Sequence, residues 1–94
     1  MNKGELTAEQ RELLRTAILR VFEANNTRFG LGVPAVCHAL GIFGFPAADS
    51  RAVQDEVEYL ADRGLVEEVL KKISRENRAW RISQEGLAFL DAGG

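Results

Sequence analysis

The chain has 94 residues, 46% of them hydrophobic and 28% charged, which predicts one globular domain over residues 1–94 with disordered ends at 1–6 and 92–94. Twelve basic and fourteen acidic side chains give a formal net charge of -2, so bulk electrostatic attraction to nucleic acid or to an anionic membrane is excluded. One cysteine excludes an internal disulfide. The sequence shows no long apolar run and no secretory leader, which predicts a cytoplasmic location without a membrane partner.

The first predicted helix begins after Thr7. Thr7 and Gln10 have the spacing of a capping box, in which each side chain bonds the other residue's backbone N–H. The apolar residues that follow recur at helical spacing and predict one buried stripe, made of Leu13, Leu14, Ala17, Ile18, Val21 and Phe22. Asn25 and Asn26 are expected to end the helix, because asparagine tolerates the left-handed conformation.

A short second helix is predicted over about residues 34–40. Pro34 suits its first turn, and Gly41 is expected to end it. The inward candidates are Val36, Ala39 and Leu40. The turn that follows is unusually apolar, so Ile42 and at least one of its phenylalanines are expected in the core. Upstream of the helix, residues 28–32 can accommodate one strand bridge.

The third predicted helix is capped by Asp49 or Ser50 and stops at Gly64. One face carries Val53, Val57, Leu60 and Ala61. Its regular apolar period makes it the clearest helix in the sequence.

A hairpin and a last short helix complete the predicted elements. Residues 65–73 are rich in β-branched side chains, and residues 79–83 alternate as a half-exposed strand does. The polar stretch 74–78 is expected to form the loop between them. Ser83 is positioned to cap the last helix, which carries Leu87 and Leu90.

Two sequence blocks resemble a winged helix-turn-helix domain. Residues 57–66, VEYLADRGLV, resemble the end of the third helix and the entry into the wing in bacterial winged-helix regulators, and residues 80–90, WRISQEGLAFL, resemble the segment that leaves the wing and opens the last helix. The resemblance implies an α+β, mainly α fold: three helices, a two- or three-stranded β-wing and a short C-terminal helix. It also implies a small DNA-binding regulator of transcription.

The apolar turn at residues 41–46 and the capped helix after it are similar to small winged-helix proteins of Mu-like bacteriophages and prophages, which are grouped loosely with ArsR-type regulators. This likeness implies a phage, prophage or bacterial gene. Two features depart from the pattern. The connection over about residues 41–49 is longer than the tight turn of a standard helix-turn-helix, and the third helix lacks a Cys-x-Cys metal-sensor motif.

The candidate nucleic-acid-binding residues fall in two groups. The N-terminal end of the third helix offers Ser50, Arg51 and Gln54 to bases or phosphates. The predicted wing carries a local charge of +4, from the single acid Glu76 and the basic residues Lys71, Lys72, Arg75, Arg78 and Arg81. These cations either grip DNA phosphates or only keep an exposed hairpin in solution and prevent edge pairing.

The outer face of the third helix gives a second hypothesis. Helical spacing places Arg51 there with three acids, Asp55, Glu58 and Asp62. Carboxylates aimed at DNA are repelled unless they accept from cytosine amino groups. The alternative is therefore a protein-protein interaction module that uses this acidic face and binds no DNA. We favour double-stranded DNA as the partner, with a homodimer formed through the first or last helix.

The sequence indicates neither an enzyme nor a cofactor or metal site. Cys37 and His38 are adjacent on a helix and diverge by about 100°, so they form no dyad. The paired acids, such as Asp55 with Glu56 and Glu67 with Glu68, are expected on solvated faces. Gly30 and Gly32 lack the lysine or third glycine of a phosphate loop, and Trp80 is expected to anchor the core.

Overall fold

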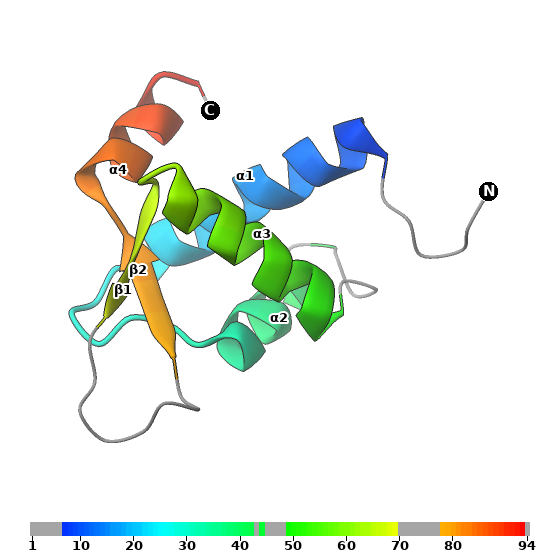
Figure 1. Cartoon of the computed structure of the whole chain (residues 1–94), viewed down its shortest axis with the longest axis horizontal. Helices are drawn as coiled ribbons and strands as arrows, with labels where there is room; N and C mark the ends of the chain where they lie inside the picture. Colours follow the sequence, from blue (N-terminus) through cyan, green and yellow to red (C-terminus); the bar gives the residue numbers. More distant parts are fainter. Residues whose placement is uncertain (1–6, 43, 45–48, 70–77, 94) are drawn as a thin grey trace.

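The computed structural model describes residues 7–42, 44, 49–69 and 78–93. In this part of the chain the elements follow the order α1 (Ala8–Ala24), α2 (Val33–Ile42), α3 (Ser50–Asp62), β1 (Val66–Val69), β2 (Ala79–Ile82) and α4 (Gln84–Asp91). Figure 1 shows α1 passing behind α3, with α2 beside them and the two-stranded ribbon at one side of the helices. The predicted coarse class, a small and mainly helical α+β protein, is confirmed.

Helix α1 begins at the predicted capping box. The Gln10 N–H donates to Thr7 Oγ1 at 3.1 Å, and the Thr7 N–H donates to Gln10 Oε1 at 2.9 Å. The helix ends at Asn25, where the sequence predicts its end. The predicted left-handed conformation is wrong, because Asn25 has a φ of -118°. Its side-chain Nδ2 donates to the Val21 carbonyl at 2.9 Å instead, so the side chain closes the helix.

The buried stripe of α1 is rotated from the predicted one. Leu14, Ile18, Val21 and Phe22 are buried as expected, but Leu13 is 59% exposed. Leu19, which the predicted stripe left out, is fully buried. The reason is tertiary: α1 packs on α4 as well as on α2 and α3, so the buried arc extends toward Leu19 and away from Leu13.

Helix α2 is longer than predicted. It runs from Val33 to Ile42, so Gly41 does not end it. Val36 and Leu40 are buried as expected. The prediction that Ile42 enters the core is wrong, because this side chain is 78% exposed; on a helix it points about 200° away from Leu40. Phe43 and Phe45 lie outside the described residues.

Helix α3 has the predicted cap, core face and stop. The Asp49 side chain accepts from the Ala52 N–H at 2.7 Å, and Val53, Val57 and Leu60 are buried. After the last helical residue, Gly64 takes a positive φ of 77°, which lets the chain turn directly into β1.

The hairpin is antiparallel, with Val66 opposite Ile82 and Val69 opposite Ala79. The predicted bridge over residues 28–32 is also present: the Leu31 N–H donates to the Trp80 carbonyl at 2.7 Å, and the Trp80 N–H donates back at 2.9 Å. Trp80 is thus held from both sides and is 1% exposed, as a core anchor should be. Residues 70–77, which include all of the predicted loop except Arg78, lie outside the described part.

Ser83, the N-cap residue of α4, connects the ribbon to the turn that follows α3. Ser83 Oγ accepts from the Gly86 N–H at 3.0 Å and donates to the Gly64 carbonyl at 2.5 Å. A Cβ at Gly86 would lie only 2.1 Å from the Leu65 carbonyl oxygen, so only glycine permits this close approach. Leu90 closes the core from this side. None of the helices in the described residues has both the length and the apolarity needed to cross a membrane.

Candidate nucleic-acid interface

A groove of about 420 Å³ lies between the first turns of α2 and α3 and the beginning of β2. Its lining residues are Val33, Pro34, Ser50, Arg51, Gln54, Arg78 and Trp80. Four of the eight residues predicted to bind nucleic acid line it, although Arg78 is far from the other three in sequence: Ser50, Arg51, Gln54 and Arg78. The α3 group and the ribbon thus meet in one place.

Two helix N-termini open onto this groove. Each N-terminus carries a partial positive charge, and the first turns of α2 and α3 contain no acidic residue. Pro34 of α2 lacks a backbone N–H, so fewer donors come from α2 than from α3. Asp49 lies just before α3 and brings a carboxylate, which caps the helix by accepting from the Ala52 N–H. Arg51, exposed on the outer face of α3, adds a full positive charge at the rim.

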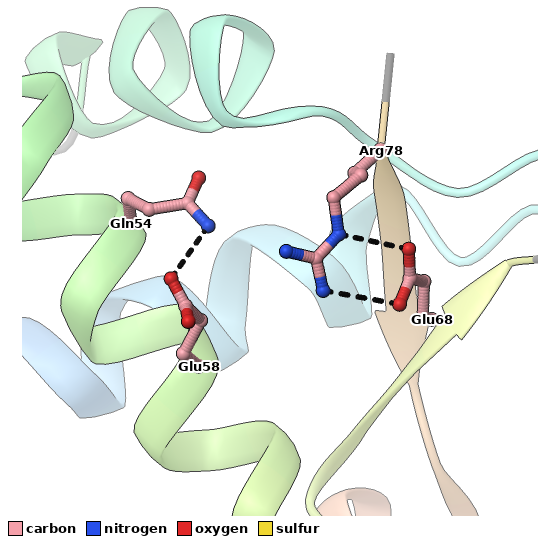
Figure 2. Close-up of polar contacts among 4 residues, drawn as sticks. All are labelled: Gln54, Glu58, Glu68 and Arg78. Atoms are coloured by element: carbon pink, nitrogen blue, oxygen red, sulfur yellow. Dashed lines mark hydrogen bonds and ion pairs between the residues drawn. The ribbon is translucent and has the colours of Figure 1, made fainter. Parts of the chain in front are cut away.

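Arg78 is held by Glu68 of the neighbouring strand. The Arg78 Nε and Nη2 atoms donate to the two carboxylate oxygens of Glu68 at 2.9 and 3.1 Å (Figure 2). The hydrogen bonds from Arg78 lower the pKa of Glu68, and Glu68 in turn raises the pKa of Arg78. The guanidinium also lies 4.9 Å from the centre of the buried Trp80 ring, so its position is defined from two sides.

Gln54 and Glu58 face this pair from α3. Gln54 Nε2 donates to Glu58 Oε2 at 2.8 Å, and Figure 2 shows both side chains on the helix opposite Arg78. The negative charge of Glu58 further raises the pKa of Arg78, so the two groups interact electrostatically. Gln54 thus lines the groove and holds the Glu58 carboxylate beside it, across from Arg78.

Arg81 does not belong to this groove. The register places Arg81 opposite Glu67 and Trp80 opposite Glu68, and neighbouring residues of a strand point to opposite faces. Arg81 Nη2 donates to Glu67 Oε2 at 3.3 Å on the face away from Trp80. The predicted set Lys71, Lys72 and Arg75 lies outside the described residues.

The predicted wing charge needs a correction. The predicted charge of +4 covers residues 71–81 and omits the strand that pairs with them. Glu67 and Glu68 lie on that strand and form ion pairs with Arg81 and Arg78. With both carboxylates included, the formal charge of the hairpin falls from +4 to +2.

The outer face of α3 is acidic in the structure too. Asp55, Glu58 and Asp62 are all exposed. Asp55 and Asp62 lie on the side of α3 that faces away from its buried residues, whereas Glu58 lies nearer the ribbon and Gln54. Of these three acids, only Glu58 is bonded to a residue that lines the groove, Gln54.

Glu56, expected on a solvated face, is 8% exposed. Arg15 Nε of α1 donates to Glu56 Oε1 at 2.6 Å, and the Arg15 guanidinium lies 3.8 Å from the centre of the Tyr59 ring. The spacing of the sequence indicates this burial, because Glu56 comes three residues after Val53 and four before Leu60, at the edge of the core face. This network closes the side of α3 that faces α1.

Cys37 and His38 lie on α2, and neither lines the groove. Burial and the charge of Asp49 raise the pKa of the Cys37 thiol, which keeps it protonated and a poor nucleophile, and His38 is exposed. In the described part of the chain, no three His, Cys, Asp or Glu side chains come together as metal ligands. Comparisons with protein-family models, with curated proteins and with solved structures find no match to this chain.

Proposed function

We propose that this protein is a winged-helix DNA-binding domain, a small transcriptional regulator of a phage, prophage or bacterium that acts in the cytoplasm. The order of helices and hairpin supports the winged-helix assignment, as does the Leu31 bridge, which adds a short third strand position beside β2. In this proposal α3 is the recognition helix and the hairpin is the wing.

The observation that carries the proposal is the meeting of α3 and the ribbon at one groove. Arg51 and Gln54 come from the N-terminal half of α3, the part of a recognition helix that contacts base edges. Arg78 reaches the same groove from the ribbon. Together with two helix N-termini, they provide donors for the acceptors of a DNA duplex.

The charge balance predicts weak binding by one copy. The two described ribbon arginines are paired with carboxylates, and Asp55 and Asp62 oppose phosphate nearby. A homodimer that binds two half-sites would compensate. Its interface is proposed on α1 or α4, where Leu13 and Phe89 are exposed.

The test is binding of a labelled DNA duplex, followed by fluorescence anisotropy at several salt concentrations. We expect measurable binding at about 50 mM salt, where phosphate contacts are strongest. Arg51→Ala should weaken it and flatten the logarithmic salt dependence by about one unit. Arg20→Ala is the matched control, because Arg20 is an exposed arginine on α1 paired with Glu23. A wild-type protein that binds no duplex at this salt concentration contradicts the proposal.

The exposed acids of α3 support a second candidate, a module that binds a basic protein partner and no DNA. Charge reversal separates the two candidates. Asp55→Lys with Asp62→Lys should strengthen DNA binding if the protein is a DNA-binding domain. If the acidic face is the functional surface instead, the variant should abolish partner binding, and neither the wild type nor the variant should bind DNA.

A further inference from the structure

The geometry of Arg78 restricts what its groove can bind. Its Nε and Nη2 atoms are engaged by Glu68, and Nη1 points away from Glu68 toward the α3 wall (Figure 2). This side-on pairing fixes the plane of the guanidinium and presents one edge to the groove. Packing over Trp80 restricts it further.

The same pairing neutralises the positive charge that would attract a phosphate group. Arg78 and Glu68 together are formally neutral, and Glu58 adds a negative charge on α3, across from Arg78. A phosphate group has only acceptor oxygens, so it would satisfy Arg78 but be repelled by Glu58 and Glu68. A ligand that fits between Arg78 and Glu58 has an acceptor toward Arg78 and a donor toward Glu58.

The Glu58 carboxylate also has a defined position, because Gln54 Nε2 donates to its Oε2 atom. Neither Glu58 nor Arg78 is deeply buried, so both can reach a macromolecule that lies over the groove.

We propose that Glu68 is a positioning residue, and that Arg78 and Glu58 read the edge of a G·C base pair rather than the DNA backbone. The inference rests on the proposed DNA-binding function. In the major groove a G·C pair presents guanine O6 and N7 as acceptors and the cytosine amino group as a donor. Arg78 donates to the guanine and Glu58 accepts from the cytosine.

The experiment compares two duplexes of equal length, one of alternating G·C and one of alternating A·T sequence, with four proteins: wild type, Glu68→Gln, Glu58→Gln and Glu67→Gln. We expect the wild type to prefer the G·C duplex by about fivefold or more. Replacing guanine by 7-deazaguanine removes N7 without changing the backbone, and should reduce that preference.

Glu68→Gln releases the charge of Arg78. It should bind both duplexes more tightly at about 50 mM salt, steepen the logarithmic salt dependence by about one unit, and bring the G·C preference toward one. Glu58→Gln should also reduce the preference. Glu67→Gln is the matched control, since Glu67 forms a one-point strand ion pair with Arg81 on the opposite face of the ribbon; it should keep the preference.

The possible failures are distinct. A wild type that binds neither duplex overturns the DNA-binding proposal and this inference with it. A wild type that binds both duplexes equally overturns the inference alone, as does a Glu68→Gln protein that keeps the wild-type preference or loses binding to both. The circular dichroism spectrum and the NMR signal of Arg78 Nε–H check, without DNA, that the variant is folded and that its guanidinium has been released.

Discussion

An arginine–glutamate ion pair lies on each of two sides of α3. We call the side that faces α1 the α1 flank, and the side that faces the β1–β2 ribbon the ribbon flank. On the α1 side, Arg15 and Glu56 form an ion pair whose side chains are 25% and 11% exposed. On the ribbon side, Arg78 and Glu68 form an ion pair with better, two-point geometry, but their side chains are 46% and 39% exposed. Both arginines lie over an aromatic ring, Tyr59 in one case and Trp80 in the other.

The difference in burial decides what each pair contributes. A charge removed from water depends on its partner, so breaking a buried pair is costly, whereas an exposed pair is screened and adds little to stability. The α1 flank is therefore structural. The ribbon flank keeps its pair close to solvent, where Arg78 stays accessible to a ligand while Glu68 holds it.

The largest expected effect is on the α1 flank. Arg15→Ala leaves the carboxylate of Glu56 mostly buried without its partner and uncovers Tyr59, so we expect the free energy of unfolding to fall by about 2 kcal/mol. Arg20→Ala, which removes an exposed pair from the same helix, should change it by only about 0.3 kcal/mol. Urea denaturation measures both, and equal effects would contradict the contrast between the flanks.

The smallest expected effect is the acid titration of the ribbon flank. Because the folded-state pKa of Glu68 is lowered by the hydrogen bonds from Arg78, the stability it contributes is present above its unfolded-state pKa and is lost as the pH falls through the lowered value. An NMR titration of the Glu68 carboxyl carbon should give a midpoint below the ordinary glutamate pKa. Arg78→Ala should restore the ordinary midpoint, and an ordinary midpoint in the wild type would rule out the pair in solution.

Local signals were readable in the sequence because they depend on neighbouring residues. The caps at Thr7, Asp49 and Ser83 and the stop at Gly64 each involve contacts within a few positions, and all four were predicted. The burial of Leu19 depends on α4, which is distant in sequence, so the periodicity of α1 alone could not reveal it.

Four of the seven residues that line the groove belong to the set predicted from the sequence, but the ion pair of Arg78 with Glu68 was not predicted. Ser50, Arg51 and Gln54 follow from the position of α3, and Arg78 from the predicted hairpin. The partner of Arg78 depends on strand register, which places Glu68 beside it and Glu67 on the other face. A count of charges along the chain contains no register, and so it overstated the positive charge of the wing.

We propose that the ribbon flank of α3 binds DNA and that the α1 flank does not. The most direct measurement is an amide chemical-shift titration with duplex DNA. The account predicts shifts at residues 49–54 and 78–81, with the amides of Arg15, Glu56 and Tyr59 unmoved. No shifts at all, or shifts centred on those three residues, would contradict it.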